Sequence, residues 1–280
     1  MPAIETGTVM VDGLSTFFRR VPGDGPPALF VHGNPTHSED WQPFLERMPG
    51  PALALDLPGW GRSARPSPSE FDYSMYGLAR FVTRFLQRMA VDEHALVIHD
   101  WGSVGLIAAQ EDPDRVRRLV IINAVPLLPG YRWHRTARVW RTRGLGELSN
   151  RLWSRRLLDL GLRESRADWR RQDPALVDMI WDHLDAGTLT ATLRLYRSAD
   201  PDRLEAAGER LASIGAPSLV VWGLRDRYIP SGFGGAYASR LPNAELVELP
   251  DAGHWPWVEV PEVVEWVIGF LATNEDFRSS

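Results

Sequence analysis

A short strand, a sharp turn and a helix of small residues constrain this chain more than any other stretch. The apolar run 95–98 leads through His99 to Asp100, and residues 102–109 include two glycines and two alanines. This pattern predicts a buried strand that turns directly into a helix, so the residue at the turn lies over the end of a sheet. The N–H groups of the helix start favour a negative charge there. We therefore expect Asp100 to be an ionised nucleophile, the alternative being an Asp that caps the next helix.

The five residues 99–103, His-Asp-Trp-Gly-Ser, resemble the nucleophile elbow of the α/β-hydrolase superfamily in the form typical of haloalkane dehalogenases. Epoxide hydrolases usually carry a close variant that ends in Gly. The resemblance implies an α/β-hydrolase fold and a covalent intermediate on Asp100. A fluoroacetate dehalogenase is not expected, because Trp101 stands where that family has Arg. Ser103 is not expected to be a nucleophile, because it would lie inside the helix.

A second loop follows the apolar run 28–31 and reads His-Gly-Asn-Pro over residues 32–35. It resembles the superfamily loop that supplies an N–H to the oxyanion hole, and Asn34 matches haloalkane dehalogenases, whereas epoxide hydrolases usually have an aromatic residue there. The resemblance implies that Asn34 and the indole N–H of Trp101 donate hydrogen bonds to a departing halide. The alternative is an Asn that only stabilises a turn.

Two further residues complete a catalytic order. Asp226 follows the apolar run 218–223, and His254 follows Gly253 in a loop. Nucleophile, acid and His in this order are typical of the superfamily, and Asp226 would accept the Nδ1 proton of His254. Many haloalkane dehalogenases carry a Glu acid after the strand that precedes the cap, but this chain has Asn-Ala-Val at 123–125. The resemblance therefore implies Asp226 as the acid.

A carboxylate nucleophile suits substitution at an sp³ carbon. Asp100 would form an alkyl ester, which water activated by His254 could hydrolyse at the acyl carbon. A halide leaves without a proton, whereas an epoxide oxygen needs one, and Tyr131 and Tyr196 are the candidate donors for that alternative. We expect a small apolar halogenated or epoxide substrate with water as second substrate, and no metal or organic cofactor. A third reading is a small-molecule receptor without turnover.

The order of predicted elements indicates an α/β fold with a mostly parallel, doubly wound sheet. Strands and helices alternate over residues 1–125 and return over 200–280, with residues 8–11 and 16–20 predicted as edge strands. Residues 126–199 contain helical patterns and no convincing strand. The superfamily commonly inserts a helical cap at this position. We therefore predict a core domain of 1–125 and 200–280, and a helical cap of 126–199.

Composition limits the chemistry and the kinds of binding partner that this chain can have. The chain has 280 residues, no Cys and a net charge of -5, so thiolate chemistry is excluded and a nucleic-acid partner is not expected. An arginine-rich stretch at 132–171 is interrupted by acidic residues and is predicted to be a solvated helical surface. Neither a signal peptide nor an apolar run long enough to span a membrane is present in the sequence, so a cytoplasmic enzyme without a membrane partner is expected. The sequence does not predict the oligomeric state.

Overall fold

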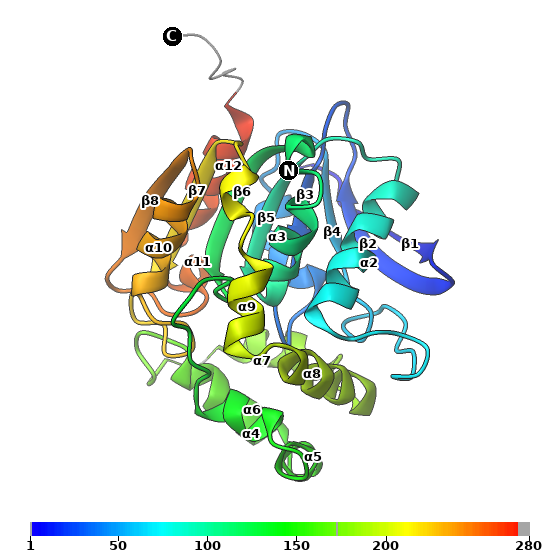
Figure 1. Cartoon of the computed structure of the whole chain (residues 1–280), viewed down its shortest axis with the longest axis vertical. Helices are drawn as coiled ribbons and strands as arrows, with labels where there is room; N and C mark the ends of the chain where they lie inside the picture. The colour runs from blue at the N-terminus through cyan, green and yellow to red at the C-terminus, as the bar shows by residue number, and fades with distance from the viewer. Residues whose placement is uncertain (1, 172, 274–280) are drawn as a thin grey trace.

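One mixed sheet forms the centre of the computed structural model, which describes residues 2–171 and 173–273 (Figure 1). The eight strands lie in the order β1-β2-β4-β3-β5-β6-β7-β8. The strands are β1 (Glu5–Val11), β2 (Leu14–Val21), β3 (Ala28–Val31), β4 (Ala52–Leu55), β5 (His94–Asp100), β6 (Val116–Ala124), β7 (Ser218–Gly223) and β8 (Ala244–Leu249). Strand β2 is antiparallel to both β1 and β4, and all later pairs are parallel. The predicted α/β-hydrolase fold is confirmed, but the prediction of two edge strands is wrong for β2, because β4 pairs with its other side.

Helices cover both faces of this sheet because alternate residues of its strands point to opposite sides. The α-helices are α1 (Gln42–Leu45), α2 (Met75–Arg88), α3 (Val104–Ala109), α4 (Arg135–Arg141), α5 (Leu145–Arg151), α6 (Arg155–Glu164), α7 (Pro174–Trp181), α8 (Ala186–Ser198), α9 (Pro201–Ala207), α10 (Gly232–Arg240), α11 (Pro256–Glu259) and α12 (Glu262–Ala272). In β5, Leu96 and Ile98 pack in one core with residues of α2, α3 and α10. Val97 packs in a second core with residues of α1, α11 and α12. The central strands are thus buried on both faces, as their continuous apolar runs predict.

The segment 126–199 carries helices α4 to α8 and no strand among its described residues. Figure 1 shows these helices gathered beyond one end of the sheet. Trp133 and Tyr196 of this segment contact Trp101, which follows the carboxyl end of β5. The helices therefore lie over the carboxyl ends of the strands, where Asp100 is located. The exact division into core and cap at 125 and 199 stays a prediction.

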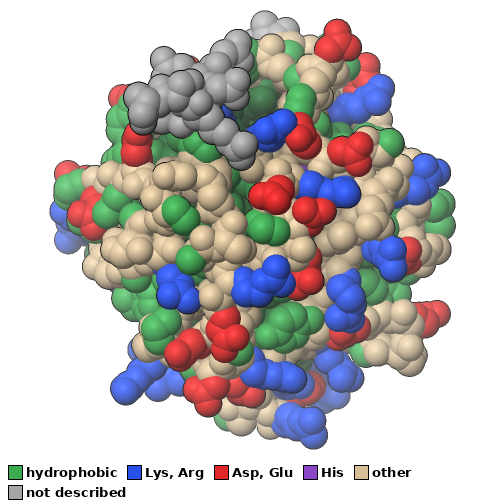
Figure 2. Space-filling view, turned by 45° about the horizontal axis from the view of Figure 1, so that its top comes forward, with side chains coloured by type: hydrophobic (Ala, Val, Ile, Leu, Met, Phe, Trp, Pro, Cys, Tyr) green, Lys and Arg blue, Asp and Glu red, His purple; other side chains and the backbone are tan. Residues whose placement is uncertain are grey.

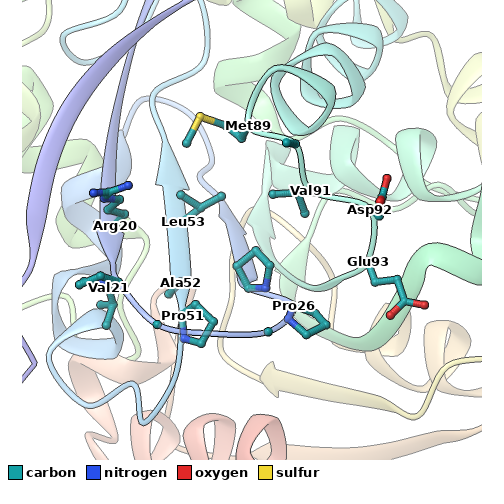
Figure 3. A pocket seen from close by; sticks show the side chains of 15 residues that line it. Arg20, Val21, Pro26, Pro51, Ala52, Leu53, Met89, Val91, Asp92 and Glu93 are labelled. Carbon is teal, nitrogen blue, oxygen red and sulfur yellow. The ribbon is translucent and has the colours of Figure 1, made fainter.

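A surface cavity also lies at the opposite end of the sheet strands. A surface cavity of about 660 Å³ lies at the amino-terminal ends of β3, β4 and β5. Figure 3 shows Pro26, Pro51, Val91 and Glu93 around it. Because β3, β4 and β5 run parallel, this cavity lies at the end of the sheet away from Asp100.

The surface of the molecule is mixed in charge. Figure 2 shows one face, on which basic and acidic side chains are interleaved and basic ones are numerous in the lower part of the view. Within the arginine-rich stretch, Arg163 pairs with Asp159 at 2.7 Å and Arg166 pairs with Asp173 at 2.5 Å. Among the described residues, none of the helices is both long and apolar enough to cross a membrane.

Candidate active site

Asp100 occupies a sharp turn between β5 and the helical residues that follow. Its backbone has φ 48° and ψ -121°, a conformation that residues other than Gly seldom adopt. Two glycines make this turn sterically possible. A Cβ on Gly33 would lie 2.5 Å from Asp100 Cβ, and a Cβ on Gly102 would lie 2.1 Å from the carbonyl oxygen of Val31. The backbone strain and these close approaches place the carboxylate over the end of the sheet, as the motif predicts.

The carboxylate of Asp100 is buried, with 5% of the residue exposed. Its Oδ2 accepts a hydrogen bond of 2.8 Å from the backbone N–H of Asn34. Burial raises the pKa of Asp100, while His254 and the backbone N–H groups of Asn34 and Trp101 act in the opposite direction. The helix start alone therefore does not decide the charge of this group. Its ionised form depends on these three neighbours.

His254 lies between two carboxylates. Its Nδ1 is 2.7 Å from Asp226 Oδ2, and its Nε2 is 3.9 Å from Asp100 Oδ1. Burial lowers the pKa of His254, but the charges of Asp226, Asp100 and Asp40 and the hydrogen bond to Asp226 outweigh burial and leave the pKa raised. The structure thus brings together the three residues that the sequence selects as nucleophile, base and acid.

Asp226 is held by four donors. Its Oδ1 accepts from the backbone N–H groups of Tyr228 and Ile229 at 2.7 and 3.1 Å. Its Oδ2 accepts from His254 and, at 2.8 Å, from Nδ2 of Asn123. Sequence reasoning named Asn123 only as the place where a Glu is missing. The sequence signal that could have drawn attention to it is a polar residue at the end of an otherwise apolar strand.

The backbone of His254 is also held in place, by residues that the sequence did not single out for this role. Nε2 of the buried His99 donates to the carbonyl oxygen of His254 at 2.8 Å, and the N–H of His254 donates to the carbonyl of Ser165 at 2.8 Å. Burial lowers the pKa of His99 well below its usual value, so this ring is neutral. These two contacts hold the backbone of His254 at both its N–H and its carbonyl oxygen, and so help to position its imidazole.

Asn34, whose backbone N–H binds Asp100, and Trp101, the residue after Asp100, each carry a buried side-chain N–H donor. Within the described residues, the buried atoms Asn34 Nδ2 and Trp101 Nε1 have no hydrogen-bond partner. The side-chain oxygen Oδ1 of Asn34, in contrast, accepts from Trp60 Nε1 at 3.0 Å and from Thr192 Oγ1 at 2.7 Å. A buried donor without a partner is costly in a folded protein, so this pair is a candidate site for an anion or another acceptor.

The two candidate proton donors of the epoxide alternative belong to the aromatic cluster around Trp101, Tyr196 directly and Tyr131 through Trp133. The ring of Tyr196 is 5.2 Å from the ring of Trp101, and Tyr131 donates a long hydrogen bond of 3.4 Å to the carbonyl of Tyr228. Burial and the charge of Asp100 raise the pKa of both phenols well above the usual value, although the approach of the Trp101 indole N–H to the Tyr196 hydroxyl acts on the pKa of Tyr196 in the opposite direction. Both tyrosines are therefore neutral at neutral pH.

A further carboxyl group near the site was missed by sequence reasoning. Asp40 is buried and accepts a hydrogen bond of 3.2 Å from Trp255 Nε1. Burial raises the pKa of Asp40 to about 7, against the effect of hydrogen bonds from Trp255 and Thr36 and the charge of His254. Asp40 changes its charge close to neutral pH and acts on the pKa of His254. Its sequence context, a polar loop, gave no sign of burial.

Fold and site geometry define the class of this protein. A sequence model of the alpha/beta hydrolase fold family matches residues 26–261. The chain therefore belongs to the α/β hydrolase fold family.

More particular similarity is found with individual proteins. The haloalkane dehalogenase of Mycolicibacterium paratuberculosis is 40% identical over 106 residues, which is 36% of this chain and 35% of that protein. The chain thus spans about a third of that relative's length. A cis-3-alkyl-4-alkyloxetan-2-one decarboxylase of Shewanella oneidensis is 25% identical over 277 residues, covering 90% of this chain and 84% of the relative.

Among solved structures, the epoxide hydrolase CorEH superposes with a TM-score of 0.81 at 18% identity, over 96% of this chain and 99% of that one. This likeness concerns the fold. The names of these three proteins describe three different reactions, so the reaction of this chain has to be argued from its site.

Proposed function

We propose that this protein is a hydrolytic haloalkane dehalogenase that converts a small haloalkane and water into an alcohol, a halide and a proton. The observation that carries the proposal is that Asn34, which binds Asp100 through its backbone N–H, and Trp101, which follows Asp100, both have buried side-chain donors without a partner among the described residues. Such donors stabilise a leaving group that becomes an anion without taking a proton. The similarity to a haloalkane dehalogenase supports the same reaction.

The first step is attack by Asp100 on the carbon that bears the halogen. Because Oδ2 is held by the N–H of Asn34, Oδ1 is the oxygen free to attack. The new C–O bond gives an alkyl ester, and the carbon–halogen bond breaks with its electron pair on the halide. Asn34 and Trp101 then donate to that halide.

The second step is hydrolysis of the ester at Cγ of Asp100. His254 removes a proton from water, and the charge that develops on Oδ2 is stabilised by the N–H of Asn34. Asp226 stabilises the imidazolium that forms on His254. Collapse of the intermediate breaks the bond between Cγ and the alkoxy oxygen, which takes the proton of the added hydroxyl and leaves as the alcohol. The carboxylate is thereby regenerated, and the other water proton leaves His254 for solvent.

The proposal is tested by halide release from a panel of chloro- and bromoalkanes. We expect release by the unmodified protein and none by Asp100→Asn. His254→Gln should form the ester and fail to hydrolyse it, leaving an alkyl mass adduct on the peptide that contains Asp100. A receptor without turnover would release no halide and form no adduct.

Epoxide hydrolysis is the second candidate, favoured by the position of Tyr196 beside Trp101. We place it below dehalogenation, because a departing halide needs only hydrogen-bond donors whereas an epoxide oxygen needs a proton. Diol formation that is lost in Tyr196→Phe or Tyr131→Phe, without halide release, would establish it.

A dialkyl oxetan-2-one assayed for CO₂ serves as a third arm, because the Shewanella oneidensis relative is named as a decarboxylase of such a compound. Halide release that persists in both Phe variants supports dehalogenation.

A further inference from the structure

The side-chain amide of Asn34 is locked in one orientation. An indole N–H can only donate a hydrogen bond, so the Asn34 atom that faces Trp60 Nε1 at 3.0 Å must be the carbonyl oxygen. The hydroxyl of Thr192 donates to the same oxygen at 2.7 Å. Both lone pairs of that oxygen are then used. An amide turned by 180° would set its own N–H groups against the indole N–H of Trp60, which cannot accept.

All three partners are shielded from water. Asn34, Trp60 and Thr192 are 6%, 1% and 2% exposed. A buried hydrogen bond cannot be replaced by one to solvent, so the loss of either donor would leave the Asn34 oxygen incompletely satisfied and the amide held less firmly. The remaining amide atom, Nδ2, has no partner among the described residues and stays available for a ligand.

We propose that Trp60 and Thr192 are positioning residues that hold Asn34 with its N–H groups toward the leaving group. This inference rests on the proposed function and deepens it. It implies that the leaving-group site offers only hydrogen-bond donors and therefore takes only leaving groups that accept hydrogen bonds. A leaving atom that needs to donate a hydrogen bond finds no acceptor on Asn34. The site is therefore selective for a halide or a similar anion.

The two positioning residues come from different parts of the chain. Trp60 belongs to the loop after β4, whereas Thr192 lies on α8 within the helical segment 126–199. The hydrogen bond from Thr192 joins positions 158 residues apart in the sequence. Correct orientation of Asn34 therefore requires α8 to be packed on the loop after β3. Packing of the helical segment and halide binding are coupled through this bond.

The test compares Thr192→Val, Thr192→Ser and Thr190→Val. Val has the shape of Thr without the donor, Ser keeps the donor, and Thr190 is an exposed residue of the same helix whose hydroxyl bonds only to the carbonyl of Ala186. Bromide affinity is measured as product inhibition and as quenching of tryptophan fluorescence, with thermal melting as the check on folding.

We expect Thr192→Val to weaken bromide binding by about 3- to 10-fold, the equivalent of one net hydrogen bond. Turnover of chloroalkanes should fall more than turnover of iodoalkanes, because chloride depends more on hydrogen-bond donors as it leaves. Thr192→Ser should restore both quantities, and Thr190→Val should behave as the unmodified protein. Trp60→Phe should reproduce the weakening by removing the second donor.

Three results would overturn the inference. If the unmodified protein binds bromide and releases halide but folded Thr192→Val does both equally well, the positioning role is wrong and the proposed function stands. The same holds if Thr192→Ser is as impaired as Thr192→Val. If the unmodified protein neither binds bromide nor releases halide, the proposed function and the positioning role fail together.

Discussion

Asn123 and Asp226 are joined by a hydrogen bond of 2.8 Å between Nδ2 and Oδ2, across 103 positions of the sequence. The other end of the same amide accepts from the backbone N–H of Gly223 at 2.8 Å. Because Asp226 Oδ2 also accepts from His254, Asn123 fixes the oxygen that orients the imidazole. The end of β6 thus supports an acid that is carried by the loop after β7.

Replacement of Asn123 by Leu should impair catalysis. The change keeps the approximate volume but leaves the N–H of Gly223 and one site of Asp226 unsatisfied, at a cost of about 1–3 kcal/mol. We expect kcat for halide release to fall by about 10- to 100-fold, measured together with thermal melting. Asn243→Leu is the control, since Asn243 is exposed and bonds to the carbonyl of Gly215. Equal kcat in a folded Asn123→Leu protein would remove Asn123 from the site.

The pH dependence of turnover should follow His254. Burial lowers its pKa but the neighbouring carboxylates raise it by more, so the acid limb of activity should lie above the usual value of 6.5 in the free enzyme. Activity rises with pH through this limb because only the neutral imidazole accepts a proton from water. In the ester intermediate Asp100 carries no charge, so the limb of kcat should lie at lower pH than that of kcat/KM.

Asp226→Asn should shift the same limb. The charge of Asp226 and its hydrogen bond both raise the pKa of His254, so their loss moves the acid limb toward lower pH. Loss of imidazolium stabilisation should also reduce kcat by about 10²- to 10⁴-fold. A pH–rate profile of the variant measures both effects. An unchanged limb would show that Asp226 does not act on His254.

Asp40 should make stability depend on pH. Its pKa is about 7 in the folded protein, mainly through burial, against 3.8 for an ordinary Asp. The folded state therefore binds the proton more tightly, so this contribution is complete below pH 3.8 and is lost as pH rises through 7. The change approaches about 1.4 kcal/mol per pH unit within this window.

Asp40→Asn should abolish this dependence, because the amide stays neutral and still offers an oxygen to Trp255. The free energy of unfolding of the variant, from urea titrations at pH 4, 6 and 8, should exceed that of the unmodified protein increasingly from pH 4 to 8. Asp24→Asn, at an exposed loop position, is the control. Parallel curves for Asp40→Asn and the unmodified protein would contradict the assignment.

Gly33→Ala should disable the site without replacing any reacting group. The new methyl group would lie 2.5 Å from Asp100 Cβ, so the β3 loop or the carboxylate must move. We expect destabilisation of about 1–3 kcal/mol and loss of most halide release. Gly235→Ala on α10, where nothing lies within 4 Å of the added methyl, should be neutral or slightly stabilising. Full activity of Gly33→Ala would show that the carboxylate is less confined than the structure indicates.

The sequence by itself determined the sheet, the turn at Asp100 and the order of Asp100, Asp226 and His254. These features depend on local rules: apolar runs form strands, and a strained turn needs small neighbours such as Gly102. Such rules act over a few residues, so they can be read from neighbouring letters. The prediction that β2 is an edge strand was wrong, because its position in the sheet depends on pairing with β4 and not on its own residue pattern.

Only the tertiary structure decided how these groups are held. The support of Asp226 by Asn123, the orientation of Asn34 by Thr192 and the burial of Asp40 each join segments far apart in the chain. Burial and hydrogen bonding across such distances depend on how the helical segment packs against the end of the sheet. Those contacts set the charges and donor directions of the site, because desolvation and hydrogen-bond geometry exist only in the folded chain.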